Sequence, residues 1–179
     1  MNQKARYLAH AAIIAALYVV LTYLASMLGL ASSAIQVRFS EALTILPFFT
    51  TAAIPGLFAG CLLANLLTGS MPLDILFGSI ATLLGAVGTY LLSRPIKSGG
   101  NPQLNPGAKL WLKWLTPLPP IIANTLIIPF VLAYVYQLED TIPYLMLTVG
   151  IGEVISCGVL GLLLQKVLER YRRQLFTRD

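Results

Sequence analysis

Charged residues are scarce in this sequence, and their scarcity excludes most soluble proteins. Of its 179 residues only 11% are charged and 57% are hydrophobic, and the mean hydropathy is +0.79. Soluble domains typically carry about 25% charged residues. A chain this poor in charge could not cover a surface that faces water. We therefore expect residues 1–179 to form a single transmembrane domain with no soluble domain.

Cysteine, histidine and catalytic motifs are also sparse. Cys61 and Cys157 lie in apolar segments without a CxxC neighbour, which argues against a disulfide framework or a zinc site. His10 has no companion that could share a metal ion. The sequence has no GxxxxGKS/T, HExxH or GxSxG motif. It therefore predicts no cofactor, no bound metal and no ATP-hydrolysing site.

Long hydrophobic stretches predict an all-α bundle of six transmembrane helices, at residues 7–30, 41–54, 56–70, 72–93, 117–137 and 143–168. The first stretch exceeds the ~7–15 residues of a signal-peptide core, so we expect it to be retained. The region 41–70 is too long for one crossing and short for two. Pro55-Gly56 in its middle is a turn signal and favours a helical hairpin there.

Basic residues predict the topology, because cytoplasmic loops collect Lys and Arg. They gather at the N-terminal end, in the connection 94–116 and in the C-terminal tail. Two crossings within 41–70 place all three groups in the cytoplasm, together with both termini, and leave only Arg38 outside. The connection 94–116 is predicted to be long and flexible. Trp111 and Trp114 near its end fit an interfacial aromatic belt.

Acidic residues within the predicted helices are candidates for function. An ionised carboxylate at the centre of a membrane helix costs at least ~2.5–3.5 kcal/mol on insertion scales. Glu153 lies on a face of small residues with Gly150, Cys157 and Gly161. It either bonds a neighbouring helix or belongs to a binding site. Asp74 also lies on a face of small residues, where it could instead cap the helix that starts after Pro72.

Other polar residues leave similar alternatives open. Asn65 and Asn124 are amides in the middle of helices, and they either join helices or contact a ligand. The segment from Gln36 to Glu41 is the most polar one on the outer side. Its Arg38 is either an ion-pair partner of Glu41 or a ligand contact.

Small residues form a stripe along the first helix, which lets another helix approach closely. The stripe either packs within the bundle or docks a partner protein. Its members are Ala5, Ala9, Ala12 and Ala16, doubled by Ala11 and Ala15.

Several segments together resemble a known family. The run from Gln36 to Pro47, followed by 53–65, is similar to the QueT family, as are 117–124 and 149–153. The members of this family are substrate-binding S components of energy-coupling factor (ECF) transporters, assigned to queuosine precursors. The resemblance spans nearly the whole chain.

The resemblance implies a multi-pass protein of the prokaryotic cytoplasmic membrane that captures its ligand from outside. It implies an ECF module as partner, with one transmembrane coupling protein and two cytoplasmic ATPases. The chain itself would not be an enzyme, and nucleic acid would not be a partner. The family's AxxxA docking motif corresponds here to Ala12–Ala16 or to Ala11–Ala15.

The implied ligand also suggests roles for the polar residues. A 7-deazaguanine presents a ring N–H beside an amino group, and one carboxylate can accept both. Glu153 is assigned this role, while Asn124 and Asn65 would read the carbonyl and ring nitrogen. Asp74 or Glu41 would meet a cationic aminomethyl group. The remaining binding candidates are Arg38, Gln36 and, for stacking, Tyr134 and Tyr144.

Three rival hypotheses remain at this stage. The chain could be an S component for another vitamin-like ligand, since the architecture is shared. It could be a small membrane enzyme in which Glu153 and Asp74 act as acid and base. It could also be a structural membrane subunit that binds no ligand.

Overall fold

The computed structural model describes residues 2–30, 36–97, 106–137 and 139–175, and within these ranges all regular structure is helical. The α-helices are α1 (Gln3–Met27), α2 (Ala53–Leu67), α3 (Pro72–Lys97), α4 (Pro106–Trp114), α5 (Leu118–Tyr134), α6 (Ile142–Glu153) and α7 (Gly161–Leu175). The 3₁₀-helix η1 (Phe39–Phe48) precedes α2, and the π-helix η2 (Val154–Leu160) joins α6 to α7. The predicted all-α fold is confirmed.

Four helical segments are long and apolar enough to cross a membrane: 3–27, 72–96, 110–134 and 142–171. Two shorter apolar elements, η1 and α2, complete the predicted six. At about 2.0 Å per residue in a 3₁₀-helix and 1.5 Å in an α-helix, each reaches only about 20 Å. This is less than the ~30 Å of a bilayer's hydrocarbon core. Neither element is therefore long enough by itself to cross the hydrocarbon core.

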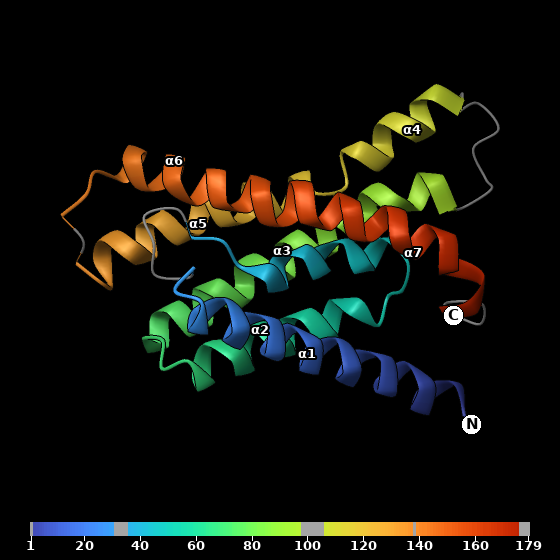
Figure 1. Cartoon of the computed structure of the whole chain (residues 1–179), viewed down its shortest axis with the longest axis horizontal. Coiled ribbons are helices and arrows are strands. Elements are labelled where there is room, and N and C mark those ends of the chain that lie inside the picture. Colours follow the sequence, from blue (N-terminus) through green and yellow to red (C-terminus); the bar gives the residue numbers. More distant parts are fainter. Residues whose placement is uncertain (1, 31–35, 98–105, 138, 176–179) are drawn as a thin grey trace.

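The element η1 lies at the centre of the bundle, where it contacts α1, α2, α3, α7 and η2 (Figure 1). Every residue from Ser40 to Thr50 is buried. The sequence predicted an α-helix over 41–54 and a turn at Pro55-Gly56, and both details are wrong. The turn comprises residues 49–52, and Pro55 lies in the first turn of α2. Proline is tolerated there because the first N–H groups of a helix have no partner within the helix.

Glycines of α2 allow close contact with α1. A Cβ on Gly56 would lie 2.7 Å from the carbonyl oxygen of Ala11, and one on Gly60 would lie 3.0 Å from the Cα of Ala15. Such distances are too short for any larger residue. The alternating Gly and Ala residues therefore set how closely the first two α-helices pack, as is usual between membrane helices.

The connection 94–116 is more ordered than predicted. The helix α3 continues to Lys97, and residues 106–114, expected to be flexible, form α4. Leu110, Trp111 and Trp114 are exposed on α4, in keeping with an aromatic belt at the membrane surface. Residues 98–105 lie outside the described part of the chain.

The two ends of the bundle differ in charge. The start of α1, the ends of α3 and α7, and α4 all lie at one end (Figure 1). The elements at this end carry the basic residues of the described chain except Arg38. The opposite end holds the short connections α2–α3 and α5–α6, with Asp74, Glu139 and Asp140.

Candidate functional site

Three of the predicted polar residues meet inside the bundle. Glu41 of η1, Asn124 of α5 and Glu153 of α6 are 2%, 4% and 7% exposed. The Nδ2 of Asn124 donates to Oε2 of Glu41 over 3.4 Å, and the Asn124 amide also interacts with Glu153. Side-chain atoms of Glu41, Glu153 and Cys157 lie within 4.8 Å of one another. We call Glu41, Asn124, Glu153 and Cys157 the buried polar cluster.

Glu41 is held by groups from three elements, α1, η1 and α5. The hydroxyl of Tyr18, itself buried in α1, donates to Oε1 of Glu41. The hydroxyl of Thr44 donates to the Glu41 backbone oxygen over 2.6 Å. With Asn124 on its other oxygen, the Glu41 carboxylate has a donor on each side. These bonds compensate for its removal from water.

Glu153 is less completely satisfied. Its Oε2 accepts from the thiol of Cys157 over 3.1 Å, and a thiol is a weak donor. Glu153 is the last residue of α6, and Cys157 lies in the π-helix that follows. Single π-turns within helices often occur at functional sites. A second carboxylate beside Glu41 is stable only with donors, a proton or a cation between the two.

By its composition the cluster could bind a metal ion, but the Cys157 thiol acts in it as a hydrogen-bond donor. The single S–H of Cys157 donates to Glu153 over 3.1 Å, and the backbone oxygen of Glu41 lies 3.5 Å from the sulfur as a second acceptor. A metal ligand would instead be the deprotonated thiolate. The arrangement is better suited to a ligand that offers several N–H donors.

The segment 36–38 covers the cluster at α6. A Cβ on Gly152 would lie only 2.2 Å from the backbone oxygen of Gln36, so only glycine fits beneath this segment. The backbone N–H of Arg38 donates to the Ser156 hydroxyl over 3.1 Å. The predicted residues Gln36 and Arg38 thus adjoin Glu153. The Gln36 contact is made by its backbone.

Arg38 also links the buried polar cluster to a second group of polar residues. Its positive charge acts on the carboxylates of Glu41, Glu153 and Asp74. Its side chain is half-buried. Both alternatives for Arg38, ion pairing within the chain and ligand contact, therefore remain compatible with its position.

Asp74 and Asn65 belong to this second group, at the start of α3 and the end of α2. The Tyr136 hydroxyl donates to Oδ2 of Asp74 over 2.8 Å, and Asn65 Nδ2 donates to the Cys61 thiol over 3.5 Å. A Cβ on Gly78 would meet Asn65 at 3.1 Å and Asp74 at 3.8 Å, so glycine leaves room for both. Partial burial, with the adjacent Asp74 carboxylate, raises the pKa of Tyr136 above its usual range. The phenol therefore remains a donor.

The two predicted stacking residues lie elsewhere. Tyr134 is 72% exposed and Tyr144 is 46% exposed, and neither joins the buried polar cluster. Tyr134 lines a groove of about 510 Å³ between α3 and α5, with apolar neighbours that include Phe77 and Phe130. A hydrogen-bonding ligand would find few partners there. The groove faces outward and is suited to lipid chains.

The alanine stripe of α1 divides into two faces. Ala15 is buried against Gly60 and Ala11 is half-buried against Gly56, whereas Ala12 and Ala16 are exposed. The pair Ala11–Ala15 therefore packs within the bundle. The pair Ala12–Ala16 is the part of the stripe that a partner could reach.

Sequence reasoning missed two members of the site. Tyr18 lies within the apolar stretch 7–30, and the signal that could have identified it is that a buried tyrosine hydroxyl usually requires a partner. In the sequence Cys157 is only one small residue on the Glu153 face, although it stands one helical turn from Glu153.

Comparison with known proteins identifies the family of this chain. The model of the QueT transporter family matches residues 8–170. A relative, the queuosine precursor transporter QueT of Lactococcus lactis subsp. cremoris (strain MG1363), is 34% identical over 84 residues, which is 46% of this chain. The match spans about half of that relative, 49% of its length. No solved structure gives a significant match.

With the family match covering nearly all of the helical bundle, the chain is a multi-pass membrane protein that belongs to the QueT transporter family.

Proposed function

We propose that the chain is the substrate-binding S component of an ECF-type importer and that it captures a queuosine precursor. The observation that carries this proposal is the buried polar cluster, in which three helical elements bring Glu41, Asn124 and Glu153 together. The name of the Lactococcus lactis relative supports the choice of ligand.

The chemistry of a 7-deazaguanine suits the cluster. Its ring N–H and amino group form a pair of donors that a carboxylate accepts in a bidentate manner. Glu153 is the better candidate, because Glu41 already accepts bonds from Tyr18 and Asn124. Asn124 can donate to the ligand's carbonyl, and Glu41 can meet a cationic aminomethyl group.

Asp74 and Asn65 are assigned a supporting place in the proposed site. Asp74 is linked to the cluster through Arg38, whose charge acts on both groups of carboxylates, and Asn65 lies with Asp74 around Gly78. Asp74 and the two carboxylates of the cluster together offer many acceptor oxygens, and a single guanidinium faces them. This imbalance favours a ligand with donor groups or a positive charge.

Partners would supply the energy for transport. The chain has no phosphate-binding loop, so ATP hydrolysis is assigned to two cytoplasmic ATPases, joined through a transmembrane coupling protein. The exposed Ala12 and Ala16 are the proposed contact with that protein. The basic end of the bundle would face the cytoplasm of a prokaryotic cell.

A membrane enzyme is the weaker alternative. The proposed acid and base occupy separate hydrogen-bonded groups, since Asp74 binds Tyr136 and Glu153 binds Cys157. Membership of a transporter family also favours a non-catalytic role.

Uptake by cells tests the proposal. A prokaryotic host that cannot make queuosine precursors would express this chain with the ECF module, with the module carrying inactive ATPases, or alone. We expect a labelled deazaguanine to accumulate only with the chain and an active module. Accumulation by the chain alone would contradict the S-component assignment, and chemical conversion of the ligand by the purified chain would favour an enzyme.

A further inference from the structure

A groove at the basic end of the bundle is separate from the buried polar cluster. It lies between α4 and α7 and has a volume of about 160 Å³. Its walls combine apolar and charged side chains: Leu110, Lys113, Trp114, Leu162, Lys166 and Glu169, with Gln165 at its base. Neither the proposed ligand site nor the exposed alanines on α1 include these residues.

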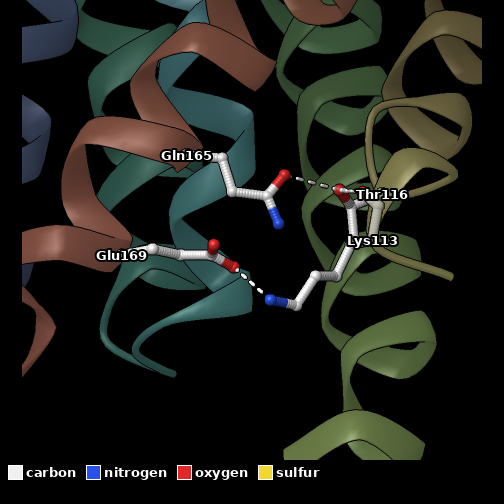
Figure 2. Close-up of polar contacts among 4 residues, drawn as sticks. All are labelled: Lys113, Thr116, Gln165 and Glu169. Carbon is white, nitrogen blue, oxygen red and sulfur yellow. Dashed lines mark hydrogen bonds and ion pairs between the residues drawn. The ribbon is translucent and has the colours of Figure 1, made fainter. Parts of the chain in front are cut away.

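Gln165 is an unusual residue at this position. It is only 4% exposed, and its Oε1 accepts from the Thr116 hydroxyl over 3.2 Å (Figure 2). Thr116 is fixed in turn, because its backbone oxygen accepts from Thr89 over 3.0 Å. The amide nitrogen of Gln165 is buried and has no hydrogen-bond partner within the described ranges. A buried donor without a partner is costly, so an acceptor from outside the chain is expected.

The charges around the groove indicate which kind of hydrogen-bond acceptor would bind to the Gln165 amide nitrogen. Lys113 pairs with Glu169 over 2.8 Å, and Figure 2 shows the Gln165 nitrogen turned toward the side where this pair forms. Lys166 is exposed and forms no ion pair within the part of the chain that the structure describes. The unbalanced cation and the unpaired N–H together favour an anionic oxygen.

The apolar side chains of the groove further restrict the kind of molecule that would bind there. Leu110 and Trp114 are exposed beside it, and Leu162 forms the opposite wall. Exposed tryptophans mark the level at which headgroups meet acyl chains. A molecule that matches this surface carries an anionic oxygen at one end and a hydrocarbon chain at the other.

We propose that the α4–α7 groove binds the headgroup of an anionic phospholipid, with its phosphate oxygen accepting from Gln165 and facing Lys166. Basic pockets between membrane helices bind anionic headgroups in this way. The first part of the acyl chain would lie against Leu110, Trp114 and Leu162. The bound lipid would then contact both α4 and α7 and stabilise their packing at the membrane surface.

The test uses delipidated full-length protein in a neutral detergent, with added phosphatidylglycerol, phosphatidylcholine or glycerol 3-phosphate. Native mass spectrometry gives the bound fraction, and thermal unfolding gives the stabilisation. We expect phosphatidylglycerol to bind about tenfold more tightly than phosphatidylcholine. Glycerol 3-phosphate, which has no acyl chain, should not bind measurably.

Two variants locate the site, and a third serves as control. Gln165→Met keeps the length of the side chain but removes the donor, so it should lose the preference for phosphatidylglycerol and be no less stable without lipid. Lys166→Gln changes an exposed residue and should weaken phosphatidylglycerol binding about tenfold. Lys4→Gln removes an exposed cation on α1 and should change nothing.

Any of three binding results would overturn the proposal, as would one result with the coupling protein. The binding results are equal binding of the two lipids, an unchanged lipid preference in both groove variants, and binding of glycerol 3-phosphate as tight as that of the lipid. The last result would identify a site for a soluble phosphate compound. If lipid has no effect but the coupling protein protects Lys166 from modification, the groove is a protein interface and the lipid proposal is wrong.

Discussion

The buried polar cluster contains two carboxylates, Glu41 and Glu153, and they differ in the hydrogen bonds that they accept. Glu41 accepts from the Tyr18 phenol and the Asn124 amide. Glu153 accepts from the Cys157 thiol and shares that amide with Glu41. A thiol donates weakly, so Glu153 keeps more capacity to accept bonds from a ligand. A ligand with two adjacent N–H groups would satisfy this capacity directly.

Replacing Glu153 by Gln therefore tests the proposed ligand contact. The amide keeps the shape of the side chain but has one acceptor oxygen and no charge. Because a hydrogen bond to a charged group contributes about 1.5–3 kcal/mol, we expect Kd for a deazaguanine to rise roughly 10- to 100-fold. Titration calorimetry on the purified variant measures this change, and thermal unfolding checks that folding is nearly intact.

Glu139→Gln is the matched control for this experiment. Glu139 is an exposed carboxylate in the connection between α5 and α6, outside the cluster. The same substitution there should leave affinity unchanged. An unaltered Kd in Glu153→Gln would remove Glu153 from the binding site.

The residues of the cluster could be predicted from the sequence to different degrees. Glu41, Asn124 and Glu153 could be selected because burying a polar group within a membrane is costly. Their assembly into one cluster could not, because it depends on how η1, α5 and α6 pack. Tyr134 and Tyr144 were chosen by residue type alone, and their outward positions depend on helix orientations that the sequence does not reveal.

The contact of α1 with α2 depends on glycines that permit close approach. Gly56→Ala places a methyl group 2.7 Å from the Ala11 backbone oxygen, so the helices must separate. We expect a loss of about 1–3 kcal/mol in unfolding free energy, as for other overpacked interiors. Unfolding in mixed detergent micelles with increasing dodecyl sulfate measures this loss.

Gly150→Ala is the matched control for Gly56→Ala. An added Cβ there meets only Thr125, at an ordinary 3.5 Å. Alanine favours a helix by about 1 kcal/mol over glycine, so this variant should be at least as stable as the parent. Equal losses in both variants would show that close approach at Gly56 is not the cause.

The unusual helices η1 and η2 lay beyond sequence reasoning. The apolar run at 39–48 reads equally well as an α-helix, and its 3₁₀ form follows from packing among five neighbouring elements. The π-helix after Glu153 has no pattern in residues 154–160 that distinguishes it from the helices on either side. Such local departures reflect tertiary contacts, which override intrinsic preference.

The whole molecule has one basic and one acidic end, and this asymmetry predicts its orientation. We expect the start of α1 to lie in the cytoplasm and the α5–α6 connection to lie outside. Single cysteines at Gln3 and at Asp140 test this with a thiol reagent that does not cross membranes, since Cys61 and Cys157 are buried. In intact cells only the cysteine at 140 should react.

Permeabilised cells provide the control, because both positions should then be labelled. Labelling of both positions in intact cells would place both on the outer side. The proposed odd number of membrane crossings between residues 3 and 140 would then be wrong. Charge parity in the sequence predicts six helices, and the described chain has four long apolar helical segments and two shorter ones. Charge parity concerns the number of crossings and not their lengths, so the short lengths of η1 and α2 could not be predicted from it.

Ligand binding by the purified chain is the most direct test of the central claim. Thermal stability would be recorded with queuine, its deazaguanine precursors, guanine, riboflavin and thiamine. A ligand at a hundredfold excess over its Kd stabilises the folded state by about 2.7 kcal/mol. We predict that deazaguanines alone raise the melting temperature, and that Glu153→Gln weakens this effect. A shift with riboflavin or thiamine instead, or with no compound, would contradict the assignment of a queuosine precursor as the ligand.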